Sequence, residues 1–165
     1  MAGYVIHLAV AEEYLRKHSN TEENYDEFIN GVIAPDGVTD KSLTHYGEKS
    51  SKVRLKKYLE ENELNTSYDK GYFLHLVTDY LFYSNYINFS KEIYNDYDIL
   101  NKYLIEKYNV KLPEKVKNKV FFLTGETKVL DLKTAEKVID EISDLDLLEV
   151  KNQVISGDKK WNINE

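Results

Sequence analysis

Hydrophobic and polar residues alternate along most of the chain with a period of about 3.6 residues, the period of an α-helix. Segments with this pattern predict amphipathic helices at residues 4–18, 24–34, 48–61, 90–108, 114–123, 132–142 and 145–155. Asp131 and Ser143 are expected to cap the last two, because their side-chain oxygens can accept a hydrogen bond from a free backbone N–H. The pattern therefore predicts an all-α fold.

One stretch departs from this amphipathic pattern. Residues 70–86 read KGYFLHLVTDYLFYSNY and are apolar or aromatic on nearly every side, which is typical of a helix buried in a core. We therefore predict a single-domain multi-helical bundle, residues 1–157, around a central helix at about residues 67–86. Residues 158–165 form a mostly polar tail that is either frayed or held in place by Trp161.

His75 and Asp79 are the ionisable residues inside this buried stretch. Because they are four residues apart, their side chains share one face of a helix and can converge on one point. Burying both is costly unless they have a partner. A divalent metal is one such partner, since it binds a neutral imidazole and an ionised carboxylate together. An ordinary ion pair within the helix is the alternative, and it is the more common arrangement.

The composition limits how a metal site could be built. The chain of 165 residues has no cysteine, which excludes disulfides and thiolate ligands, so a transition-metal site must use His, Asp and Glu. Only four histidines are available. The formal net charge of −7 argues against nucleic acid as the main partner, because a phosphate backbone requires a basic surface. It does not exclude the hydrolysis of a phosphoester.

The N-terminal sequence, MAGYVIHLAVAEEYL, has neither a basic segment nor a long apolar run before its first acidic residues. We therefore expect no signal peptide. No apolar run along the chain is long enough to cross a bilayer, so no transmembrane segment is expected. A cytoplasmic protein is the default expectation, and the oligomeric state stays open.

Three residues outside the central helix are further candidates for ligands. His7 lies off the apolar stripe of its helix and is either a boundary histidine or a ligand. Asp36, between Pro35 and Gly37, either caps a turn or points inward as a ligand. His45 precedes the predicted helix 48–61, whose N-terminal dipole would favour the neutral imidazole that a metal binds.

The remaining polar and aromatic features have simpler explanations. His18, at the end of the first helix, is interpreted as structural or solvated. The lysines of helix 48–61 form a basic face that is best explained as a solvated side. Most of the fourteen tyrosines are expected to pack in or beside the core. By position, Tyr72, Tyr80 and Tyr83 are the ones that could direct a hydroxyl at the site.

Three short runs resemble a known family. GVIAPDG, THY and FLHLVTDYLFY, all within roughly the first ninety residues, resemble the bacterial zinc-dependent phospholipase C family, whose superfamily includes fungal single-strand nucleases. The resemblance implies that Asp36, His45, His75 and Asp79 bind a first zinc ion and that Asp79 bridges to a second. It implies that His7 binds this second zinc, which in the family is completed by the N-terminal amine and carbonyl.

The chain departs from the family at a third zinc. In the family this ion is held by two further histidines and a glutamate downstream, whereas this chain has no histidine after His75. We therefore expect one zinc ion or two. The same ligands would also tolerate Mn²⁺ or Fe²⁺.

The resemblance implies a function as well as a site. A zinc-dependent hydrolase of a small-molecule or lipid phosphoester is expected, with Asp36 orienting or deprotonating the attacking water. Signatures of other helical metal enzymes, such as HExxH, are absent from the sequence. The alternative is a non-catalytic helical scaffold or interaction protein that retains a vestigial metal site.

Overall fold

Helix α5, Ser67–Leu81, is the buried central helix, and it continues as a π-helical turn at Phe82–Tyr86. In the computed structural model, which describes residues 2–165, every side chain from residue 73 to residue 82 is buried. The helix begins at a capping box: the Thr66 side chain accepts from the Asp69 N–H, and the Asp69 side chain accepts from the Thr66 N–H. The central helix predicted for residues 67–86 is therefore confirmed.

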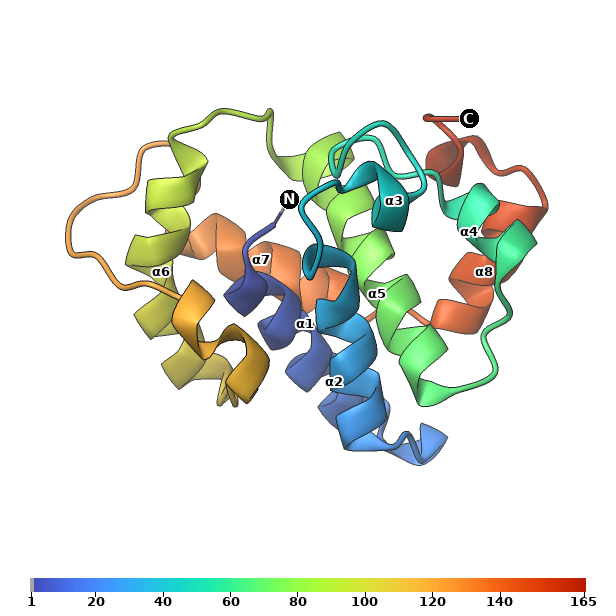
Figure 1. The fold of residues 1–165 in the computed structure, drawn as a ribbon, viewed down its shortest axis with the longest axis horizontal. Coiled ribbons are helices and arrows are strands. Elements are labelled where there is room, and N and C mark those ends of the chain that lie inside the picture. Colours follow the sequence, from blue (N-terminus) through green and yellow to red (C-terminus); the bar gives the residue numbers. More distant parts are fainter. Residues whose placement is uncertain (1) are drawn as a thin grey trace.

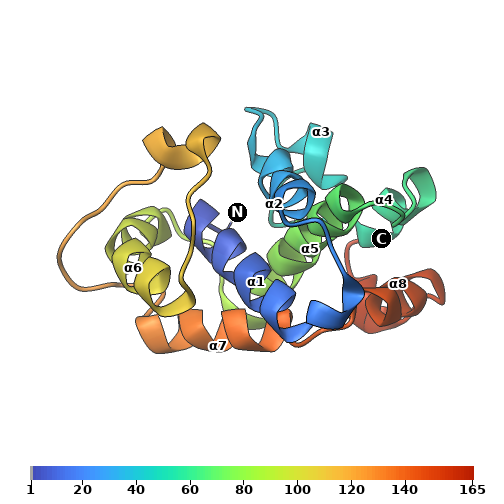
Figure 2. The same cartoon turned by 90° about the horizontal axis from the view of Figure 1, so that it is seen from below.

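The other helices surround α5 and α1 (Figures 1 and 2). No β-strand occurs in residues 2–165, so the all-α, single-domain fold is confirmed. No helix among these residues is long and apolar enough to cross a membrane. The remaining α-helices are α1 Tyr4–Lys17, α2 Tyr25–Ile33, α3 Ser42–His45, α4 Leu55–Glu61, α6 Ile93–Tyr108, α7 Leu132–Ser143 and α8 Leu147–Ile155.

Helices α2 and α5 cross at unusually close range, and two glycines allow it. A β-carbon on Gly31 of α2 would lie 2.1 Å from the backbone oxygen of Tyr68, and one on Gly71 of α5 would lie 2.1 Å from that of Phe28. Each helix therefore presents a glycine to the backbone of the other. This crossing brings the end of α2, and the Ala34–Asp36 turn that follows it, against the middle of α5.

Helix α1 lies in the middle of the bundle and contacts α2, α5, α6 and α7. Figure 2 shows α7 running beneath α1, with α6 to one side and α8 at the far end. The C-terminal tail is held in place rather than frayed. Trp161 is buried, and its indole N–H donates to the Gln153 side chain at 2.7 Å. The Tyr80 hydroxyl of α5 donates to the Lys160 carbonyl at 2.6 Å, so the tail packs directly behind the central helix.

The helix predicted for residues 48–61 was predicted too long, because α4 begins only at Leu55. Residues 46–53 instead form a tight loop in which Tyr46 has a left-handed backbone, φ 59°. A β-carbon on Gly47 would lie 1.8 Å from the Lys52 carbonyl oxygen, so the chain doubles back there. This close approach is incompatible with a continuous helix, although the Lys and Glu spacing favours one.

Two other helix boundaries also differ from the predictions. Of the helix expected at 114–123, only the 3-10 turn Glu114–Lys119 forms. The next backbone groups bond to α6 instead: the Asn101 side chain donates to the Phe121 carbonyl at 2.9 Å. The last long helix was expected at 145–155 with Ser143 as its cap. It begins at Leu147 and is capped by Asp146, because Ser143 is the final, buried residue of α7.

Candidate metal centre

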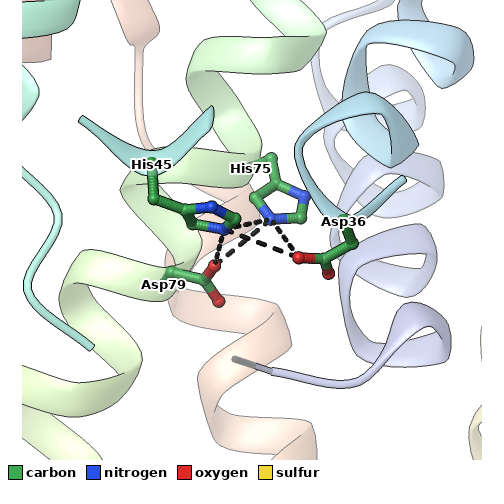
Figure 3. Close-up of side chains that lie close together, drawn as sticks. All are labelled: Asp36, His45, His75 and Asp79. Carbon is green, nitrogen blue, oxygen red and sulfur yellow. Dashed lines mark hydrogen bonds and ion pairs between the residues drawn. The ribbon is translucent and has the colours of Figure 1, made fainter. Parts of the chain in front are cut away.

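Four predicted ligands from three separate segments converge at the middle of the bundle. Asp36 ends the turn after α2, His45 ends α3, and His75 and Asp79 lie one turn apart on α5. Each contributes one ligand atom, and the four atoms lie within 4.8 Å of one another (Figure 3). All four residues are buried, with at most 5% of any residue exposed.

Five of the distances between these atoms are close to those of a tetrahedral metal site. Asp79 Oδ2 lies 3.0 Å from His45 Nε2 and 3.2 Å from His75 Nε2, and the two Nε2 atoms are 3.3 Å apart. Asp36 Oδ1 lies 3.5 Å from His45 Nε2 and 3.6 Å from His75 Nε2. Ligands about 2.0 Å from a tetrahedral zinc ion are about 3.3 Å from each other. The four atoms could therefore hold one metal ion.

Both histidines turn the same nitrogen toward the centre. His75 Nδ1 lies 2.6 Å from the Val32 carbonyl oxygen, and His45 Nδ1 lies 3.1 Å from that of Lys41. A carbonyl only accepts, so each Nδ1 must carry the proton and donate it. In a neutral imidazole this leaves the Nε2 lone pair free for a metal, the arrangement that orients metal-bound histidines in proteins.

Two buried carboxylates make positive charge favourable at the centre. Burial lowers the pKa of His75, but Asp36 and Asp79 outweigh it and raise that pKa to about 10. Burial likewise raises the pKa of Asp79, but His7 and His75 hold it well below its usual value. A cation, either a proton or a metal ion, is therefore strongly favoured at His75 Nε2.

Asp36 is held by its backbone, whereas its carboxylate has only long ion-pair contacts, at 3.5 Å to His45, 3.6 Å to His75 and 4.0 Å to Lys41 Nζ. The Asp36 carbonyl accepts from the Tyr4 hydroxyl at 2.9 Å and from Lys41 Nζ at 3.0 Å. Both carboxylate oxygens of Asp36, in contrast, are buried and have no hydrogen-bond partner in the described structure. Buried carboxylate oxygens without partners are costly. Ligation of a metal would remove this cost, so the donor set fits an ion.

His7 lies beside the four-residue group and contacts it through Asp79. Its Nε2 lies 3.0 Å from Asp79 Oδ1, the oxygen on the far side of the carboxylate, and the Ala2 N–H donates to the same oxygen at 3.0 Å. The His7 ring stacks on the His75 ring with centroids 3.6 Å apart. Burial and the charge of His75 lower the pKa of His7, so it is a neutral ring that orients Asp79.

The expected environment of His45 was wrong. The residue ends the short helix α3, so it lies at a helix C-terminus and not at the N-terminus of the following helix. The dipole there does not favour a neutral imidazole. The metal-binding nitrogen is instead selected by the hydrogen bond from Nδ1 to the Lys41 carbonyl. Backbone acceptors such as this one and Val32 carry no signal in the sequence, and the sequence analysis missed them.

The tyrosine candidates divide into two groups. The Tyr72 hydroxyl donates to the Thr44 carbonyl at 2.7 Å, and the Tyr80 hydroxyl bonds to the tail, so neither hydroxyl joins the four ligand atoms. Tyr83 follows Asp79 by one helical turn and is half-buried. Burial raises the pKa of its phenol, and the negative charges of Asp79 and Asp36 raise it further. His18 bonds to the Ser143 carbonyl, away from the centre.

Comparisons of the chain with protein-family models, with curated proteins and with solved structures find no match. The resemblance to the zinc-dependent phospholipase C family therefore stays a prediction. What the structure itself provides is a buried group of two imidazoles and two carboxylates that could hold one metal ion.

The surface next to the centre has a substantial pocket. It has a volume of about 620 Å³, and its walls include Tyr4, Ala34 and Gly37, which adjoin Asp36 in sequence or contact it. Lys115 and Lys119 also line the pocket. None of the four ligands lines this pocket.

Proposed function

We propose that the protein is a zinc-dependent hydrolase of phosphoesters, similar to phospholipase C, that works with one metal ion held by Asp36, His45, His75 and Asp79. The observation that carries the proposal is the convergence of four buried donor atoms within 4.8 Å of one another, with five of the distances between them at 3.0–3.6 Å. The same four residues are those implied by the family resemblance. Mn²⁺ or Fe²⁺ would accept the same donors.

The two carboxylates have different roles in this proposal. Asp79 contacts both histidines at 3.0 and 3.2 Å and is oriented by His7, so it is a fixed ligand. Asp36 lies farther from both histidines and has no hydrogen bond on either oxygen. It is therefore the ligand that can release one position to a water molecule and accept that water's proton as a general base.

The metal would supply the rest of the chemistry. A bound zinc ion lowers the pKa of a nearby water and offsets the negative charge that develops on phosphoryl oxygens. The chain holds the histidines through their Nδ1–H bonds to backbone carbonyls, and it excludes bulk water by burying all four ligands. A phosphoester from a small molecule or a lipid would be the substrate.

A non-catalytic metal-stabilised scaffold is the second candidate. The observation in its favour is burial: His45 and Asp79 are both 0% exposed, and four protein ligands close a tetrahedral site. Structural zinc sites are closed in this way, whereas catalytic ones keep a position open. The two candidates therefore differ in whether Asp36 leaves the ligand sphere.

Metal analysis and a phosphodiesterase assay on three variants separate the two candidates. The zinc content of purified protein is measured by mass spectrometry, and hydrolysis of bis-p-nitrophenyl phosphate is followed with and without chelator. For Asp79→Asn we expect loss of zinc and of activity. For Asp36→Asn we expect retained zinc and a fall in activity of about 100-fold, the usual contribution of a general base. Exposed Asp144→Asn is the matched control and should change neither quantity.

Zinc content and activity together distinguish the hydrolase from the scaffold. Zinc bound by the wild type without hydrolysis of any phosphoester would favour the scaffold. Unchanged zinc content and activity in Asp79→Asn would refute both the site and the hydrolase. Circular dichroism of each variant shows whether a loss reflects the site or an unfolded chain.

A further inference from the structure

Three consecutive large apolar side chains lie on the surface after the turn Glu114–Lys119. Phe121, Phe122 and Leu123 are 60%, 57% and 49% exposed. Figures 1 and 2 show the connection from this turn to α7 looping out at the edge of the molecule. A contiguous exposed apolar run of this kind usually marks a site of interaction with another surface.

The fold holds this run outward by specific bonds. The Leu123 N–H donates to the Asp98 carbonyl at 3.1 Å, and the Asn101 side chain bonds the Phe121 carbonyl. On the far side of the loop, Asp96 is buried and its carboxylate accepts three backbone N–H groups, those of Lys128, Val129 and Leu130, at 2.7–2.9 Å. The exposed side chains are thus presented by an anchored loop.

The charge around the apolar run is opposite to that of the whole chain. Residues 111–128, named here the basic apolar loop, contain five lysines and two glutamates, a net charge of +3 in a chain whose net charge is −7. Lys115, Lys117 and Lys119 are all exposed. They lie on the 3-10 turn directly before the phenylalanines.

We propose that the basic apolar loop docks the protein on an anionic lipid surface. Lysines are depleted from the cores of protein–protein interfaces. Lysines beside exposed phenylalanine and leucine are instead typical of segments that insert apolar side chains at the level of the headgroups and pair their charge with anionic lipids. None of the four ligand residues belongs to this loop, so the proposal does not depend on any hydrolase activity.

Sedimentation with vesicles tests this docking. We expect the full chain to bind vesicles of phosphatidylcholine mixed with phosphatidylglycerol, to bind phosphatidylcholine alone about tenfold less well, and to dissociate as salt is raised. A variant with Phe121, Phe122 and Leu123 all changed to Ser should lose the binding. The matched control changes Leu148 and Ile163 to Ser, two side chains with 57% and 59% exposure outside the loop.

A second pair of variants separates charge from apolar insertion. Lys115→Glu with Lys117→Glu should weaken binding to the anionic vesicles by about tenfold or more, whereas Lys56→Glu with Lys57→Glu on α4 should leave it unchanged. Absence of wild-type binding to either vesicle, or equal binding by the triple serine variant, would overturn the proposal. Self-association of the wild type that the serine variant abolishes, without vesicle binding, would assign the loop to a protein interface instead.

Discussion

At the scale of single residues, metal binding at the centre depends on which histidine nitrogens carry protons. His75 donates its Nδ1 proton to the Val32 carbonyl, so a second proton at Nε2 makes it an imidazolium and competes directly with a metal. The carboxylates of Asp36 and Asp79 favour either cation. Metal-free and metal-bound protein should therefore respond to pH in opposite ways.

The pH dependence of stability follows from the raised pKa of His75. In the folded, metal-free protein this pKa is about 10, against 6.5 as the ordinary value. His75 therefore contributes stability that is fully present below pH 6.5 and is lost as pH rises toward 10, by at most about 1.4 kcal/mol per pH unit. With chelator present, urea midpoints should fall between pH 7 and pH 9.

With zinc present the trend should reverse, because a higher pH removes the proton that competes with the metal. His75→Gln should lose the fall seen with chelator, and His18→Gln should keep it. Identical pH profiles with zinc and with chelator would contradict this interpretation of His75.

A substitution of His7 tests whether a residue that contacts a ligand changes the affinity of the site for zinc. Since its Nε2 contacts Asp79 Oδ1, His7→Ala should weaken zinc binding by about 10- to 100-fold while leaving one ion per chain. Competition with a chromophoric chelator measures the affinity, and His18→Ala is the control. A fall from two zinc ions to one would instead show that His7 ligates a second metal.

Residue-level prediction from the sequence had a clear limit. The spacing of His75 and Asp79 on an apolar helix was sufficient to find the first pair, because helix geometry alone places them together. The position of His45 at a helix C-terminus could not be predicted from the sequence, since the four-residue helix α3 is too short to show a periodic pattern. Contacts to backbone carbonyls likewise arise only from the tertiary fold.

At the scale of elements, the centre rests on the crossing of α2 and α5. This crossing positions the Val32 carbonyl for His75 and delivers Asp36 to the same point. The crossing depends on Gly31 and Gly71, at which a β-carbon would meet the facing backbone at 2.1 Å. A substitution at either glycine should therefore weaken metal binding, although neither glycine is a ligand.

Gly71→Ala should destabilise the protein by about 3 kcal/mol or more, because rigid backbone opposes the added methyl group. It should also weaken zinc binding, since α2 must move away from α5. Urea unfolding and a zinc titration measure the two effects. Lys102→Ala is the control, because this exposed side chain lies on α6, away from the crossing and from the four ligands. Equal effects of the two substitutions would contradict this role for the crossing.

Helix existence was easier to predict than helix length. The apolar faces of α1, α2, α6 and α7 recur with the helical period, and α5 is apolar on nearly every side, so these patterns located the helices. The helix at 48–61 and the helix at 114–123 were predicted too long because tertiary contacts replaced helical hydrogen bonds. The loop at Gly47 and the bonds from α6 to residues 121–123 are such contacts.

At the scale of the whole molecule, the centre links segments that are far apart in the chain. Asp36 and Asp79 are 43 residues apart, and His45 ends α3, where the neighbouring Thr44 carbonyl accepts from the Tyr72 hydroxyl of α5 at 2.7 Å. On the other side of α5, Trp161 and the tail pack against Tyr80. The hydrophobic pattern predicted an all-α domain and the composition excluded cysteine ligands, but only the fold shows that one ion could join these segments.

X-ray absorption at the zinc edge, on protein purified after growth with zinc, tests the central claim most directly. We predict one zinc ion per chain with four nitrogen or oxygen ligands at about 2.0–2.1 Å, two of them imidazoles, and loss of this spectrum in Asp79→Asn. Protein that stays free of zinc, manganese and iron after dialysis against each would contradict the account. A spectrum without imidazole ligands would contradict it equally.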